Sequence, residues 1–388
     1  MSSEGDCSIV LVEPYFTRIG HNVEYSTNIY FGMKDRAPVC LILSSDKTTE
    51  DMAQHFASRN EGVLIRPHEF RYDGSVWKRF GMFLSAMWTV IREVSGKERR
   101  VLVLFAYEPA IIYSLRGLLH FRRVLLVDHS CEYPARPEWD IKSLYKFLGK
   151  YFVRGLSRDP RFRFVVHSRY HRDRMVSLIP EQAERVVEIE YGCTIHPLCP
   201  RPPSTTGERL VFLPGIWRRD KGIEFLFEHF PSELLVSGYR ILLAGYPQEI
   251  SPDVLMGIAE KRGIADKVQI IDRYLEPEHL HELYARVTYA VFPYLPHYSG
   301  GAGPVKDACG HGCPVLSSDA AGLGEIIREH GMGLSFRSGD PIDFVKIALE
   351  MEGIIRNGGL GVFSENATRY AESISWPRFA EKLLASCA

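Results

Sequence analysis

The sequence lacks three features that would each point to a particular class of protein. Its formal net charge is -1 at pH 7, so no overall positive charge attracts nucleic acid. Its eight cysteines include no C-x-x-C pair, the spacing on which common structural zinc sites are built. A long uncharged run, residues 289–305, is broken by proline and glycine, so we expect no membrane span there.

The first residues are also unlike a signal peptide. The stretch "MSSEGDCSIVLVEP" has acidic residues and only a very short apolar run. Scattered cysteines are typical of reduced thiols in a cytoplasmic protein. We therefore expect a cytoplasmic protein, at most peripheral on the inner face of a membrane, with no nucleic-acid partner.

Short β-branched runs alternate with helical patterns along most of the chain. Continuous apolar strands separated by helices are typical of a parallel sheet that is covered on both faces. A proline-rich segment, residues 197–208, interrupts the alternation and predicts a linker. We expect an α/β protein of two Rossmann-like, doubly wound domains, residues 1–196 and 209–372, which face a central cleft. The expected strands are residues 9–12, 39–43, 101–105, 124–127, 162–166, 210–213, 240–244, 268–271, 289–292, 314–316 and 333–336.

A glycine-rich loop precedes an expected helix in "SGGAGPVKD". Pro304 suits the first turn of a helix, where its missing N–H costs nothing. The backbone N–H groups of Gly300, Gly301, Ala302 and Gly303 would then converge on an anion such as a diphosphate. Asp307, one turn inside the helix, would accept hydrogen bonds from ribose hydroxyls. The alternative is a tightly packed loop followed by an acidic residue that favours the helix dipole.

A second stretch, "PGIWRRDKG", places cations in a loop between a strand and a helix. Gly215 ends the buried strand, and Arg218, Arg219 and Lys221 follow it. Such cations would neutralise a diphosphate leaving group. The alternative is a charged loop that is simply solvated.

Two weaker candidates lie in the first half. Gly20 follows the first expected strand, where the backbone would approach a ligand closely. His129 stands at the carboxyl end of another strand, on the same cleft, although a lone histidine is more often structural.

The second half resembles a known family through several stretches in order. They are "PGIWRRDKG", "ILLAG", "YAVFPYLPHYSGGAGPVKDACGHGCPVLSSDAAGLGEII" and "GMGLSF". Together they look like the C-terminal half of retaining glycosyltransferases of the GT-B fold, family 4. The match covers roughly residues 210–336, whereas the first half matches only in layout.

The resemblance implies a hexosyltransferase that uses a nucleotide-sugar donor, with UDP or GDP as the nucleotide. The diphosphate would meet the amides of Gly301 to Gly303 and Lys221, and the ribose would meet Asp307. His129 would lie near the donor sugar, and Gly20, Gly215, Arg218, Arg219 and residues 299–303 would help to bind the donor. The resemblance further implies retention, no metal and no cofactor. The acceptor would be a glycan, a lipid-linked or a small-molecule acceptor, and residues 373–388 would form a helix that packs back on the first domain.

The chain departs from the family pattern at three positions. Ile216 stands where the family has arginine, Ser299 where it has its first glutamate, and Asp307 where it has its second. Other classes therefore stay open: a nucleotide-sugar epimerase or sugar phosphorylase on the same fold, or a non-catalytic nucleotide-sugar-binding scaffold.

The helix expected between Ile141 and Arg158 is both basic and aromatic. A cation recurs at every fourth position, and no acidic residue lies between the first and the last. The pattern favours an anionic membrane surface or a lipid-phosphate acceptor. A solvated face on a core-packed helix is the alternative. The cations are Lys142, Lys146, Lys150, Arg154 and Arg158.

Overall fold

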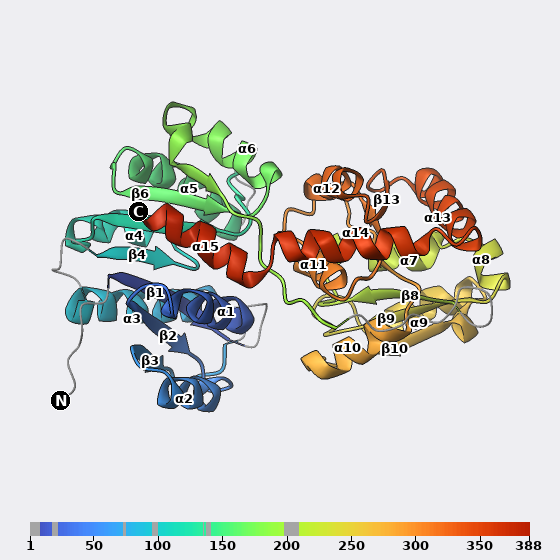
Figure 1. The fold of residues 1–388 in the computed structure, drawn as a ribbon, viewed down its shortest axis with the longest axis horizontal. Coiled ribbons are helices and arrows are strands. Elements are labelled where there is room, and N and C mark those ends of the chain that lie inside the picture. The colour runs from blue at the N-terminus through green and yellow to red at the C-terminus, as the bar shows by residue number, and fades with distance from the viewer. Residues whose placement is uncertain are drawn as a thin grey trace. The chain divides into compact units, whose positions relative to one another are not determined.

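Figure 1 shows the computed structural model of the chain, which describes residues 8–17, 22–72, 75–94, 100–134, 136, 141–197 and 209–388. The chain forms two compact units. The N-terminal unit comprises Met1–Gly192 together with Trp376–Ala388, and the C-terminal unit comprises Cys193–Ser375. The predicted Gly20 and most of the predicted linker, residues 198–208, lie outside the described residues.

The N-terminal unit contains a parallel seven-stranded sheet. Its strands are β1 (Ile9–Phe16), β2 (Val39–Ser45), β3 (Val63–Pro67), β4 (Val101–Leu104), β5 (Arg123–Asp128), β6 (Phe162–Val166) and β7 (Val186–Glu188). They lie in the order β3-β2-β1-β4-β5-β6-β7. The helices are α1 (Asn22–Lys34), α2 (Glu50–Arg59), α3 (Val76–Thr89), α4 (Pro109–Leu115), α5 (Ile141–Ser157), α6 (Arg169–Leu178) and α15 (Trp376–Cys387).

Helices cover both faces of this sheet because its central strands are apolar on both sides. Along β1, Val10 and Val12 join one core with α3, α5 and α6, while Ile9 and Leu11 join another with α1 and α15. Helix α15, the last of the chain, packs closely on α1. A β-carbon added to Gly32 of α1 would lie only 2.6 Å from the β-carbon of Ala380.

The C-terminal unit has a parallel six-stranded sheet in the order β10-β9-β8-β11-β12-β13. Its core likewise divides into two clusters, one on each face. The strands are β8 (Arg209–Pro214), β9 (Tyr239–Ala244), β10 (Val268–Ile271), β11 (Tyr289–Phe292), β12 (Val315–Ser318) and β13 (Gly333–Phe336). The helices are α7 (Ile223–His229), α8 (Ser232–Val236), α9 (Pro252–Lys261), α10 (Pro277–Arg286), α11 (Gly303–Gly310), α12 (Leu323–His330), α13 (Pro341–Arg356) and α14 (Leu360–Ser373). The prediction of two doubly wound α/β halves is confirmed.

Candidate functional site

The strand order of the C-terminal sheet reverses between β8 and β11, which pair in parallel. From β8 the chain crosses to β9 on one side, and from β11 it crosses to β12 on the other. Ligands of doubly wound sheets bind outside the carboxyl ends of the strands at such a switch point. The two stretches singled out in the sequence are the loops that follow β8 and β11.

The glycine loop after β11 leads directly into α11, as its sequence predicts. Ala302 precedes the helix in the left-handed conformation, with φ of 52°, and its amide donates to the hydroxyl of Tyr298 at 3.1 Å. The amides of Gly300, Gly301 and Gly303 donate to no other described residue. The loop therefore offers an anion three of the four predicted backbone donors at a helix N-terminus, and the fourth, the amide of Ala302, is already engaged.

Tyr298 organises this loop, although sequence reasoning did not select it. Its ring stacks on Tyr294 with centroids 4.1 Å apart. A β-carbon on Gly300 would meet the Tyr298 hydroxyl at 2.6 Å, so only glycine permits this approach. Burial raises the pKa of Tyr298 to about 12, so the hydroxyl keeps its proton while it accepts the Ala302 amide.

Lys221, in the loop after β8, is a buried cation. It is 8% exposed, and among the described residues no carboxylate lies within ion-pair distance of its ammonium. Burial, followed by the nearby charge of Arg218, lowers the pKa of Lys221 to about 8. The negative charges of Asp220 and then Asp307 act in the opposite direction. A buried ammonium without an ion-pair partner would be stabilised by a bound anion.

The two loops meet at Gly215, the first residue after β8. A β-carbon on Gly215 would lie 3.3 Å from Nζ of Lys221 and 3.5 Å from Cγ of Pro304, in the first turn of α11. The structure thus brings Gly215 and Lys221 to the start of the helix that carries the glycine loop. Asp307 lies on the same helix and is half-buried, and Ser299 in the loop is also half-buried.

The two predicted arginines have different surroundings. Arg218 pairs with Asp220, with Nε 3.0 Å from Oδ1. The side chain of Arg219 is 65% exposed and pairs with Glu224 at 3.2 Å. The charge of Arg218 acts on Lys221, whereas Arg219 is directed to the surface.

His129, in the N-terminal unit, is the first residue after β5. Its Nε2 lies 2.8 Å from the carbonyl oxygen of Phe105, so Nε2 carries the proton and Nδ1 has a lone pair. The ring contacts those of Tyr25 and His167, with centroids 5.2 and 4.9 Å away. Burial lowers the pKa of His129, so the imidazole is neutral at neutral pH and offers Nδ1 as an acceptor.

Asp128 fixes the turn on which His129 lies. Its carboxylate accepts the amide of Cys131 at 2.8 Å and the hydroxyls of Tyr107 and Tyr133 at 2.9 and 2.6 Å. Cys131 has φ of 48°, which few side chains other than glycine adopt. These contacts hold the turn in a conformation that the backbone alone would disfavour.

Glu13 is a buried carboxyl that the sequence reading missed. It lies in the apolar strand β1, is 2% exposed, and accepts the amide of Tyr15 at 2.9 Å. Burial raises the pKa of Glu13 to about 8, so it is mostly protonated at neutral pH. A glutamate inside the otherwise apolar run "IVLVEPYF" was the available sequence signal.

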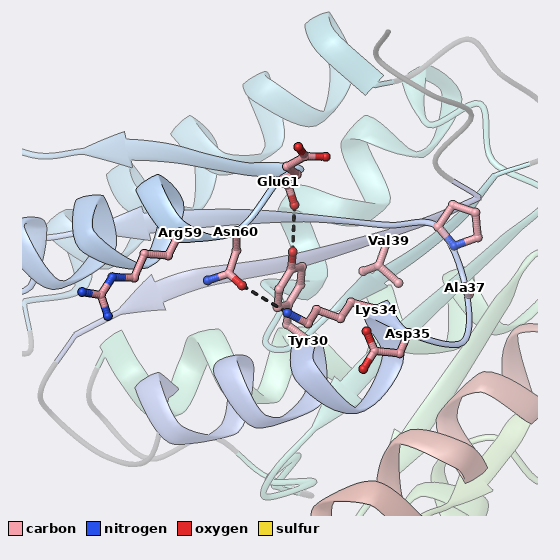
Figure 2. Close-up of a pocket in the computed structure, with 9 residues that line it drawn as sticks. Tyr30, Lys34, Asp35, Ala37, Val39, Arg59, Asn60 and Glu61 are labelled. Carbon is pink, nitrogen blue, oxygen red and sulfur yellow. Dashed lines mark hydrogen bonds between the residues drawn. The ribbon is translucent and has the colours of Figure 1, made fainter. Parts of the chain in front are cut away.

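A surface cavity of about 350 Å³ lies elsewhere in the N-terminal unit (Figure 2). Lys34, Val39, Asn60 and other residues line it, and Lys34 donates to Asn60 at 3.4 Å. Val39 is the first residue of β2, and Asn60 lies in the turn between α2 and the start of β3 at Val63. The cavity is therefore at the opposite end of the sheet from His129.

The sequence of the C-terminal unit matches a known family. Residues 207–352 match the family model described as Glycosyl transferases group 1. The matched segment includes Gly215, Lys221, the glycine loop and Asp307.

Two proteins called D-inositol 3-phosphate glycosyltransferase are similar to the chain. The one from Nocardia farcinica is 27% identical over 245 residues, which are 55% of this chain and 52% of that protein. The one from Rhodococcus erythropolis is 31% identical over 150 residues, 38% of this chain and 33% of that protein. The chain thus aligns with about half or less of the length of these relatives.

Solved structures are similar over nearly the whole chain. Sucrose-phosphate synthase from Thermosynechococcus elongatus has a TM-score of 0.76 at 14% identity, covering 97% of each chain. Anabaena Alr3699/HepE, solved in complex with UDP, has a TM-score of 0.69 at 13% identity, covering 98% of this chain and 99% of that one. At such identities the likeness shows the fold, which is the GT-B fold of two Rossmann-like domains.

Proposed function

We propose that the protein is a glycosyltransferase that transfers a hexose from a nucleotide-diphosphate sugar, with UDP or GDP as the nucleotide, and retains the anomeric configuration. The observation that carries the proposal is the buried, unpaired ammonium of Lys221 beside the first turn of α11. The Glycosyl transferases group 1 match spans both loops of this site. The similar HepE structure, which contains UDP, supports a nucleotide as the ligand.

In this proposal the donor diphosphate takes the amides of Gly301 and Gly303 and the ammonium of Lys221. Asp307 accepts hydrogen bonds from the ribose, and the role of His129 near the donor sugar stays a prediction. The bond between the anomeric carbon and the diphosphate oxygen breaks while the acceptor oxygen bonds to that carbon on the same face. The acceptor proton passes to the departing phosphate. The main catalytic contribution is stabilisation of the leaving group by fixed donors and a cation, and no metal is needed.

We also propose that the N-terminal unit rests on an anionic membrane at the cytoplasmic face and takes its acceptor there. On α5, Leu148 and Tyr151 are exposed beside Lys150. On α3, Trp77 and Trp88 are 82% and 61% exposed, on one face of the helix. Exposed tryptophans with nearby cations are typical of helices that lie in a membrane interface.

Some cations of α5 already have partners within the protein. Lys146 pairs with Glu132, and Arg154 donates to the carbonyl of Leu178 at 3.0 Å, so both are partly engaged. The side chains of Ile141 and Lys142 lie outside the described part. Within the described ranges, no helix combines the length and apolarity needed to cross a bilayer.

The test of the function is thermal unfolding with UDP, GDP, ADP and their sugar derivatives, followed by assay of nucleoside diphosphate release. A ligand at about a hundred times its dissociation constant stabilises the folded state by roughly 2.7 kcal/mol, which shifts the midpoint measurably. We expect a shift with one nucleotide, which Asp307→Ala reduces. Asp253→Ala, which alters an exposed aspartate in the first turn of α9, is the matched control.

Turnover separates the enzyme from its alternatives. A transferase would release nucleoside diphosphate when an acceptor is present. Without an acceptor it would release it only slowly, as water hydrolyses the donor. An epimerase would convert one nucleotide sugar into another without releasing nucleoside diphosphate. A phosphorylase would require inorganic phosphate. A scaffold would bind and release nothing. No shift with any nucleotide would overturn the proposed site.

A further inference from the structure

Three histidines from distant segments meet in the C-terminal unit. His196 lies in the segment that opens this unit, His281 lies on α10, and His311 caps the end of α11. One ring nitrogen from each lies within 4.8 Å of those of the other two. His311 is buried, and the other two are half-buried.

Backbone and ring contacts hold the cluster in place. The amide of His196 donates to the carbonyl of Gly310 at 2.9 Å, which ties its segment to the end of α11. The ring of His311 stacks on Tyr284 on one side, with centroids 4.4 Å apart, and on His196 with centroids 3.9 Å apart. The amide of His311 donates to the carbonyl of Asp307 at 3.1 Å. The three rings are therefore gathered by the fold itself.

The arrangement of nitrogens fits a metal of the zinc type. Nδ1 of His281 lies 3.2 Å from Nδ1 of His311. Two imidazole ligands of tetrahedral zinc, each about 2.0–2.1 Å from the ion, are separated by about 3.4 Å. At least one of the two facing nitrogens needs a proton for a hydrogen bond, and an ion would take the place of that proton.

We propose that His196, His281 and His311 bind one divalent transition metal ion of the zinc type, with water as the fourth ligand. Neutral imidazoles suit zinc, copper and nickel, whereas magnesium and calcium require oxygen ligands. The rings of His196 and His311 are parallel to within 4°, so the His196 ring leaves this stack when its nitrogen turns toward the ion.

The ion would act on the fold rather than on the transfer reaction. Helix α11 has 8 residues and so is about 12 Å long, which separates His311 from the glycine loop at its other end. The ion would join α10, the end of α11 and the segment of His196. It would therefore fasten the helix whose first turn forms the proposed diphosphate site.

The experiment is titration of the tag-free full chain, stripped of metal, with Zn²⁺ by calorimetry and with Co²⁺ by visible absorption. We expect one equivalent to bind and Co²⁺ to give the intense d–d bands of a tetrahedral site. His281→Gln should weaken binding at least about 10-fold, since even second-shell partners of metal ligands contribute about 10–100-fold. His196→Phe should do the same while it keeps an aromatic ring in the stack. His279→Gln, an exposed histidine on the same helix, is the control and should bind as the wild type does.

His311 is buried, so His311→Gln also tests folding, and the two other variants carry the test. Circular dichroism tests whether each variant is folded. Undiminished binding in folded His281→Gln and His196→Phe would assign the ion to other residues. Failure of the folded wild type to bind an equivalent of either metal would overturn the proposal outright.

Discussion

The ammonium of Lys221 lies in tight contact with the position that a β-carbon on Gly215 would occupy. A β-carbon at position 215 would come within 3.3 Å of Nζ and within 3.5 Å of Cγ of Pro304. Gly215 also has φ of 114°, which side chains rarely adopt. The close meeting of the loops after β8 and β11 therefore requires glycine at this position.

Gly215→Ala should weaken both the fold and nucleotide binding. The positive φ should cost about 1 kcal/mol or more of unfolding free energy. Displacement of Lys221 should weaken the binding of the nucleoside diphosphate by roughly tenfold, which is about 1.4 kcal/mol of binding free energy. Urea unfolding and calorimetry measure the two effects.

Gly257→Ala is the matched control for this substitution. Gly257 lies inside α9, and a β-carbon there would have no atom within 4 Å. Because alanine is the better helix former, this variant should gain up to about 1 kcal/mol. Equal nucleotide affinity in the two variants would contradict the role given to Gly215.

The affinity for the nucleoside diphosphate should fall as the pH rises above about 8. The pKa of Lys221 is lowered to about 8 in the free protein, and a bound diphosphate would raise it. Binding is then strongest below pH 8, where Lys221 is already charged. Above pH 8 Lys221 is mostly neutral in the free protein, so it must take up a proton from solution when the diphosphate binds. The affinity then drops by up to about tenfold per pH unit.

Calorimetry at pH 7, 8 and 9 on the wild type and on Lys221→Gln measures this dependence. Lys221→Gln should remove the Lys221 contribution and leave only the titration of the nucleotide itself. Arg219→Gln changes an exposed cation two residues away and should keep the full dependence. An identical pH profile in the wild type and in Lys221→Gln would exclude contact between Lys221 and the phosphates.

The architecture was predictable because the central strands are buried on both faces. A strand such as β4, buried along its full length, reads as a continuous apolar run. The edge strands β3 and β7 were not predicted. β3 is only partly buried, and β7 has 3 residues, so neither leaves a strong apolar signal.

The donor site was predictable only in part. The glycine loop and Lys221 follow strands that the alternation marks, so their position at the switch point could be expected, and their binding roles stay predictions. The direction of Arg219 depends on its partner Glu224, which spacing does not reveal. Tyr298 was missed because its hydroxyl acts on a loop amide, a contact that only the folded turn creates. The histidine cluster comes from three separate segments and leaves no spacing pattern.

Glu13→Gln should change how stability depends on pH. Burial raises the pKa of Glu13 from 4.5 to about 8 in the folded state. Between these values the unfolded chain releases a proton that the folded chain retains, so the free energy of unfolding falls as the pH rises from 4.5 to 8. Glutamine does not ionise, so its free energy of unfolding does not fall in this way. Between pH 4.5 and pH 8 the stability of the variant relative to the wild type should therefore rise by up to roughly 4 kcal/mol.

Urea unfolding at pH 5 and pH 8 measures the change, and the exposed Glu69→Gln should show none. Parallel pH profiles for the wild type and Glu13→Gln would show that the carboxyl is ionised when folded.

The exposed aromatic residues of α3 should carry most of the binding to a membrane. Trp77 and Trp88 are mostly exposed, so their replacement should leave the fold intact. We expect the Trp77→Ser/Trp88→Ser double variant to bind vesicles that contain anionic lipid at least about tenfold more weakly, because each indole loses its burial in the interface. Ile342→Ser is the control. It removes an apolar side chain from α13 of the C-terminal unit that is as exposed as Trp77, at 82%, and it should bind as the wild type does.

Co-sedimentation with anionic and with neutral vesicles, at low and high salt, separates the aromatic contribution from that of the α5 cations. Equal sedimentation of the wild type and the double variant with anionic vesicles would remove α3 from the interface. Absence of binding by the wild type would leave the acceptor to be met in solution.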